Sequence, residues 1–146
     1  MPTPHTKKYV IRSVIICDDA RLEITGKEIL VGVYNDALLV SSFPVILPKL
    51  VFRIAYRMLV DEELNTIRFV IKDPRGMTIL ESSGQIALQD RSVPERIFGV
   101  NITNVLFAAS GTYEILVGLD EEPTPVWDFT VRLPKDRVES ERIKMI

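Results

Sequence analysis

The sequence reads Leu-Val-Phe-Arg-Ile-Ala-Tyr-Arg-Met-Leu-Val from residue 50 to residue 60. Apolar side chains recur in this stretch with a period of two, which is the period of a β-strand. One face of the predicted strand is continuously apolar and is formed by Leu50, Phe52, Ile54, Tyr56, Met58 and Val60. The other face carries Arg53 and Arg57, which we expect at the surface. Burial of one large apolar side chain contributes roughly 1.5 to 3 kcal/mol, so the apolar face predicts a second layer packed against this strand.

The composition is that of one globular domain. The chain has 146 residues, of which 47% are hydrophobic and 26% are charged, and its mean hydropathy is +0.16. A chain of this length can bury one sizeable core without help from disulfides or metals. The formal net charge is -2 and the 18 basic residues form no run, so nucleic acid is not an expected partner.

We expect three parts in the chain: a flexible N-terminal arm over residues 1–7, a single β-sandwich domain over residues 8–134, and a charged C-terminal tail over residues 135–146. Cys17 is the only cysteine, so it cannot form an internal disulfide and is expected to be a small buried apolar residue. The apolar run before Asp18 is too short for a signal peptide or a membrane span. Cytoplasmic residence is the resulting prediction.

The rest of the chain predicts roughly eight or nine short strands. A first strand is expected over residues 8–17, ended by Asp18 and Asp19. A hairpin-like unit follows, with a short piece over residues 22–24, a turn at Thr25-Gly26-Lys27 and a strand over residues 29–34. The turn at residues 73–76, Asp-Pro-Arg-Gly, predicts a hairpin, because proline and glycine stand where a type I turn prefers them. The fold class predicted is all-β, a two-sheet antiparallel β-sandwich, immunoglobulin-like or a related Greek key, with a short C-terminal tail or helix. The segment Gly111-Thr112-Tyr113 is similar to the corner of immunoglobulin-like sandwiches, where a tyrosine hydroxyl ties the chain.

Simple alternation also assigns side chains to faces. It places Ile15 and Cys17 on the face of Tyr9, and it places Asn104 and Leu106 on the face of Phe98. Trp127 has the parity of Phe129 and is expected in the core. The alternative for Trp127 is an exposed platform with Tyr34 that stacks on a sugar or a peptide. Pro44 and Pro48 are expected to interrupt the chain before the central strand, since proline cannot donate to a sheet ladder.

Several segments resemble an uncharacterised bacterial family of small β-sandwich domains. The relevant residues are Ile-Cys-Asp-Asp-Ala-Arg at 16–21, Gly26-Lys27, Leu-Val-Gly-Val-Tyr at 30–34, Phe43-Pro44, Leu47-Pro48-Lys49, Asp73 to Gly76 and Gly111 to Tyr113. The resemblance implies a β-sandwich fold and a bacterial or phage origin. It implies no catalytic residue, because the function of that family is unknown.

The sequence shows no constellation of catalytic residues, so we predict no enzyme and no cofactor. His5 is the only histidine and has no nucleophile nearby in a predicted strand, which argues against a hydrolase triad. The seven glycines are scattered singly, so there is no phosphate-binding loop, and a zinc site lacks its usual ligands.

Carboxylates at strand ends are the remaining candidates for chemistry. Loops of a sandwich gather at its poles, and hard cations such as calcium take several oxygen ligands from such loops. The candidate metal ligands are Asp18, Asp19, Asp73 and Asp120.

The leading functional hypothesis is a non-enzymatic cytoplasmic binding or structural module that acts through protein–protein contacts or self-association. The candidate partner-binding residues are the apolar ones of the tail, Ile143, Met145 and Ile146. The alternative is a metal- or small-molecule-binding protein or enzyme that uses the strand-end carboxylates.

Overall fold

A computed structural model gives the structure of the chain and describes residues 7–86 and 92–135. These residues contain nine strands. They are β1 (Tyr9–Leu22), β2 (Glu28–Tyr34), β3 (Ala37–Leu39), β4 (Val45–Met58), β5 (Thr66–Lys72), β6 (Thr78–Gln85), β7 (Glu95–Phe107), β8 (Gly111–Leu119) and β9 (Thr124–Arg132). Within the described ranges there is no apolar helix of membrane-spanning length.

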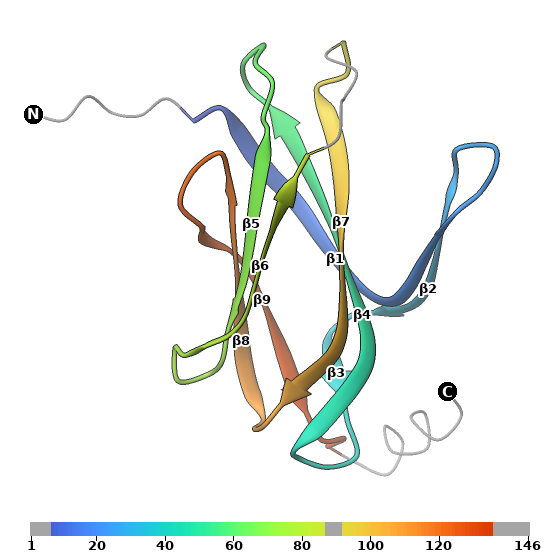
Figure 1. Cartoon of the computed structure of the whole chain (residues 1–146). Coiled ribbons are helices and arrows are strands. Elements are labelled where there is room, and N and C mark those ends of the chain that lie inside the picture. The colour runs from blue at the N-terminus through green and yellow to red at the C-terminus, as the bar shows by residue number, and fades with distance from the viewer. Residues whose placement is uncertain (1–6, 87–91, 136–146) are drawn as a thin grey trace, which may run out of the picture.

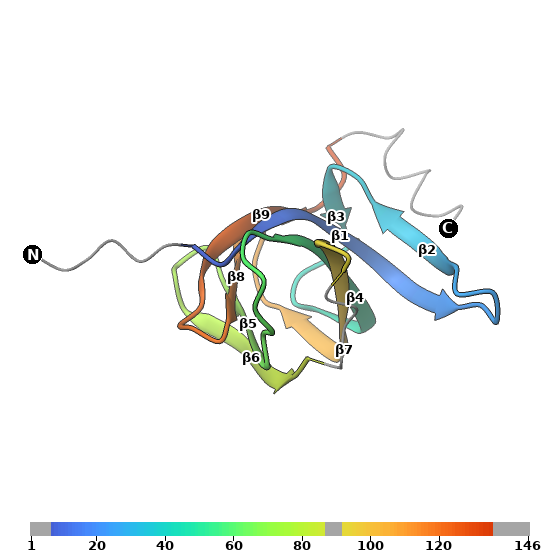
Figure 2. The same ribbon diagram turned by 90° about the horizontal axis from the view of Figure 1, so that it is seen from above.

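The strands form two sheets that face each other as a β-sandwich (Figures 1 and 2). The four-stranded sheet has the order β2-β1-β4-β7, and the five-stranded sheet has the order β3-β9-β8-β5-β6. The strand pairs are antiparallel except β3 with β9, which is parallel. The predicted all-β sandwich is confirmed.

The core is built on the predicted central strand, which is β4. Its inward side chains Leu50, Phe52, Ile54 and Tyr56 are fully buried. Aromatic rings from the other sheet pack on them, and the centroids of Phe52 and Phe69 lie 5.0 Å apart. The burial of this face confirms that the second layer covers it.

Two face assignments are wrong because the strands contain irregularities. The register of β1 against β4 shifts between Ile11 and Ser13, so the alternation reverses there and Ile16 faces the core. In β7, Asn104 has a left-handed backbone with φ 55°. As a result Val105 is buried and Leu106 is exposed, whereas a regular strand would place them the other way.

Two predicted strand ends are also wrong. β1 continues past Asp18 and Asp19 as far as Leu22. β4 begins at Val45 and contains Pro48, because at this position β4 pairs with β7 only, and the ladder with β1 starts at Val51. A proline is tolerated where one side of a strand is unpaired.

The predicted tyrosine corner is present. The Tyr113 hydroxyl donates to the carbonyl oxygen of Ala109 at 2.7 Å, and the ring packs edge-on against Phe107. Gly111, at φ 142°, leads into this strand. The predicted turn at residues 73–76 is confirmed as well, since the Gly76 amide donates to the Asp73 carbonyl at 2.9 Å.

Candidate interaction site

The most conspicuous feature outside the sandwich is a projecting hairpin. The second half of β1 and most of β2 leave the body together (Figures 1 and 2). We call residues 18–34 the wing. Its tip is the turn predicted at Gly26, where φ is 85° and the amide donates to the Glu23 carbonyl at 2.9 Å.

Polar contacts at the base hold the wing at a fixed angle. The Tyr34 hydroxyl donates to Asp18 Oδ1 at 2.6 Å, and burial together with this bond raises the pKa of Tyr34. The Asp18 carboxylate lies against Gly32, whose φ is 68°. A Cβ at this position would come within 2.2 Å of Asp18 Oδ2, so the bend at the base of the wing requires glycine.

A second set of contacts ties the wing to β4. Lys49 Nζ donates to Asp19 Oδ1 at 2.6 Å, and Arg53 forms an ion pair with Glu28. The expectation that Arg53 lies at the surface is therefore wrong: only 16% of its side chain is exposed, and its Nε is buried without a hydrogen-bond partner. Arg57, by contrast, is an exposed partner of Glu95. A charge that is mostly removed from water needs its counterion, so the Arg53–Glu28 pair fixes the wing against the sheet.

Stability at acidic pH is expected to depend on Asp19. Lys49 and, after it, Arg21 lower the pKa of Asp19 to about 2 by hydrogen bonding. An unfolded aspartate titrates near pH 4, so this carboxylate stabilises the fold above about pH 4 and loses that contribution as the pH falls towards 2. We expect Asp19→Asn to melt at a lower temperature than the wild type at pH 6 and at nearly the same temperature at pH 2. A difference in melting temperature that is constant with pH would contradict this role.

The wing exposes a row of apolar side chains. Ile29, Val31 and Val33 alternate along β2, and each is 44 to 45% exposed. We call these three residues the stripe. At the end of the wing, Leu22 and Ile24 are still more exposed. Isolated exposed apolar residues are ordinary, but a contiguous group of them on a rigid element is typical of an interaction surface.

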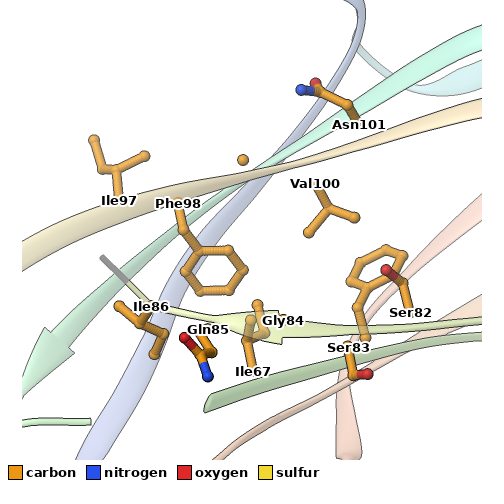
Figure 3. Close-up of a pocket in the computed structure, with 12 residues that line it drawn as sticks. Ile67, Ser82, Ser83, Gly84, Gln85, Ile86, Ile97, Phe98, Val100 and Asn101 are labelled. Carbon is orange, nitrogen blue, oxygen red and sulfur yellow. The ribbon is translucent and has the colours of Figure 1, made fainter. Parts of the chain in front are cut away.

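A groove between the two sheets is the second surface feature. β6 and β7 are edge strands of different sheets and do not pair with each other. Between them lies a hollow of about 490 Å³, into which Phe98, Val100 and Ile67 point (Figure 3). Among the described residues, its lining contains serines and amides and no ionisable side chain. The described lining therefore offers apolar contact and neutral hydrogen-bonding groups.

The four candidate metal ligands do not come together. Asp18 and Asp19 are on the wing, Asp73 is in the β5–β6 turn and Asp120 follows β8, so they occupy three separate regions of Figure 1. In the ranges that the structure covers, no three His, Cys, Asp or Glu side chains are placed to share a metal ion.

The two loop carboxylates are engaged in their own turns. Asp73 accepts from the amides of Arg75 and Met77, each at 2.9 Å. Asp120 accepts from the Thr66 amide at 2.7 Å. Burial would raise the pKa of Asp120, but the amides of Asn65 and Thr66 outweigh it and lower the pKa. A metal site on these carboxylates stays a prediction.

Comparison with known proteins gives one family. Residues 12–132 match the model described as "Family of unknown function (DUF6941)". The chain belongs to this family. The resemblance to an uncharacterised family is thereby confirmed, and the matched residues of DUF6941 include the whole wing. A search of curated proteins finds no match.

The aromatic pair of the alternative platform lies at the base of the wing. Trp127 is 43% exposed and does not join the core, so its predicted burial is wrong. It occupies the seam between β9 and β1, where it lines a hollow of about 100 Å³ together with Tyr34 and Asp128. The two rings form no stacked pair with each other among the described aromatic contacts.

A hairpin with its turn at Gly26 and its second strand over residues 29–34 is predicted and is present, but its projection from the sandwich as a wing is not predicted. Two adjacent aspartates favour a strand end, yet each has a partner on a neighbouring strand, Tyr34 or Lys49. The signal that could have found the projection is that Ile29 and Val31 alternate along β2 while the residues opposite them, Arg21 and Asp19, are charged. The candidate partner-binding residues Ile143, Met145 and Ile146 lie outside the described residues, as do His5 and the tail from residue 136.

Proposed function

We propose that this member of DUF6941 is a non-enzymatic binding module that holds another protein chain on its wing. One observation carries the proposal: the stripe is exposed on a hairpin whose angle is fixed by the contacts of Asp18, Asp19 and Glu28. A rigid surface loses little conformational entropy when a partner docks, so its apolar area contributes more fully to affinity.

The strand order supports a finer description of the fold as immunoglobulin-like. Adjacent strands β9-β8-β5-β6 and β1-β4-β7 correspond to the arrangement of strands G-F-C-C′ and A-B-E in such domains, and Tyr113 occupies the place of the tyrosine corner at the start of strand F. Loops and edges of these sandwiches commonly serve binding. We also propose a bacterial or phage origin, from the resemblance of the quoted segments, and cytoplasmic residence, which the single buried thiol of Cys17 suits.

Site-specific photo-crosslinking in cells tests the proposed function. A photoreactive amino acid is placed at Val31 in the stripe or, as a matched control, at Met77, which is apolar and 62% exposed in the β5–β6 turn. We expect a crosslinked protein adduct at position 31 and none at position 77. Absence of an adduct at position 31, or equal adducts at both positions, would overturn the proposal. Mass spectrometry of the adduct identifies the partner chain.

The alternative function is a metal- or small-molecule-binding protein or enzyme that uses strand-end carboxylates. Calorimetry distinguishes it from the binding module proposed above. A native-state ligand must raise the melting temperature. Binding of calcium, magnesium or manganese tighter than roughly 10 μM, with such a rise, would favour the alternative.

A further inference from the structure

We propose that the partner on the wing is a second copy of this chain. The two β2 strands would pair edge to edge and antiparallel about a two-fold axis that passes beside Val31, so that the two stripes join in one apolar surface. This inference rests on the proposed function and names its partner.

The first argument comes from the edges of the sheets. An exposed strand edge invites pairing with another chain, and proteins protect such edges with short strands, charges or kinks. The described edge β3 has three residues, β6 carries Glu81 followed by two serines and a glycine, and β7 is kinked at Asn104. β2 is seven residues long and carries its only charge at its first residue, Glu28. β2 has a left-handed residue of its own, Gly32, so a kink does not distinguish it from β7. β2 and β7 are thus the two described edges of more than three residues that carry charges only at their first residues, and of these two β2 carries the stripe.

The second argument is that β2 is complementary to a second β2 strand that runs antiparallel to it. With Val31 on the axis, Val31 faces its own copy and Ile29 of one chain faces Val33 of the other. Glu28 then lies opposite Tyr34, and its charge is already neutralised by Arg53. No like charges meet along the strand. Two-fold symmetry of this kind closes after two copies and gives a dimer.

The charges that flank the stripe favour an antiparallel over a parallel arrangement of the two β2 strands. Lys27 precedes the stripe and Asp36 follows it, and both are exposed. In the antiparallel arrangement, Lys27 of each copy approaches Asp36 of the other. A parallel arrangement would place Lys27 against Lys27 and Asp36 against Asp36, which costs free energy.

The contact is small, so the dimer is expected to depend on concentration. A stable interface buries about 800 Å² on each partner, and three half-exposed side chains supply only part of this area. Leu22 and Ile24 near the wing tip extend the apolar surface beyond the stripe. Association is therefore expected in concentrated protein and dissociation on dilution.

The first test compares two charge substitutions on the full chain by sedimentation equilibrium. Val31→Lys places two like charges at the axis and is expected to raise the dimer dissociation constant at least tenfold. Met77→Lys adds the same charge at an exposed apolar position away from the wing and is expected to leave the constant unchanged. Wild-type protein that is monomeric at every concentration, or equal effects of both substitutions, would overturn the inference.

The second test reads the register by disulfide formation under mild oxidation. Val31→Cys brings two thiols together across the axis, within the Cα separation of about 4.4 to 6.8 Å that a disulfide needs. Ile24→Cys is the control, because Ile24 is more exposed than Val31 but stands seven residues from the axis. Ile24 is in the turn and level with about residue 26, so the two thiols introduced at position 24 would be separated by roughly 30 Å at 3.3 Å per residue. The native Cys17 is fully buried and does not compete.

We expect a disulfide-linked dimer from Val31→Cys and essentially none from Ile24→Cys. Equal crosslinking of the two variants would show random collision and would overturn the inference. If neither variant crosslinks but photo-crosslinking at Val31 captures a different protein, the second copy is ruled out and the proposed function stands. If photo-crosslinking also gives no adduct, both fail.

Discussion

Ile54→Asp is expected to yield no folded protein. Ile54 is in the middle of β4, has no exposed surface and belongs to the core between the two sheets. A carboxylate there would be buried without a partner, and the cost of such a group is comparable with the whole stability of a domain, about 5 to 15 kcal/mol. Soluble yield and far-ultraviolet circular dichroism measure the result.

The control for this substitution is Ile54→Val, which removes one methylene group and is expected to cost about 1 kcal/mol. This variant should stay folded with a β-type spectrum. If Ile54→Asp gave a spectrum and a yield like those of Ile54→Val, the assignment of this face of β4 to the core would be wrong.

Gly118→Ala is expected to lower the free energy of unfolding by about 3 kcal/mol. The added methyl group would overlap with backbone atoms of the β8–β9 loop. A Cβ at Gly118 would lie 2.2 Å from the Glu121 carbonyl oxygen and 2.8 Å from the backbone of Pro123. The β8–β9 loop cannot easily move away. Two hydrogen bonds fix this loop: the Asp120 carboxylate accepts from the Thr66 amide at 2.7 Å, and the Tyr9 hydroxyl donates to Glu121 at 2.6 Å.

Thermal unfolding measures this effect, and a loss of this size corresponds to about 10 °C for a domain of this length. Gly99→Ala is the matched control, since a Cβ at Gly99 meets no atom within 4 Å and the change is expected to stay within about 0.5 kcal/mol. Equal melting temperatures for the two alanine variants would contradict the prediction and would show that the β8–β9 loop moves to accommodate the methyl group at little cost.

The parts of the fold that the sequence predicts are those where side chains alternate without interruption. The face of Leu50, Phe52 and Ile54 is assigned correctly because β4 runs straight through the middle of its sheet. Alternation fails at Asn104 and between Ile11 and Ser13, where one irregular residue reverses every side chain that follows. A left-handed asparagine leaves no mark in a hydrophobic pattern.

The hairpin of the wing is predicted, but its projection from the sandwich could not be predicted, for a different reason. Asp18 and Asp19 favour a turn by their local preference, and only contacts from distant residues, Tyr34 and Lys49, hold them in a strand. Alternation along β9 places Trp127 on the same face as core residues, but it does not show that this end of β9 borders a hollow between β9 and β1. The stripe depends on topology, since Val31 is half-exposed on an edge strand of its sheet and alternation alone does not show which strands are edges.

The one parallel pair of the described sandwich has a mechanical consequence. Ala37, Leu38 and Leu39 of β3 run in the same direction as Thr130, Val131 and Arg132 of β9. Suppose that the two ends of the chain are pulled apart, so that force acts on β3 at its N-terminal end and on β9 at its C-terminal end. Because the two strands are parallel, the force slides them past each other along their length. Their hydrogen bonds then carry the load together, in shear, instead of opening one after another as in a pulled hairpin. This short patch is therefore the place where we expect the domain to resist stretching once β1 and β2 have been detached.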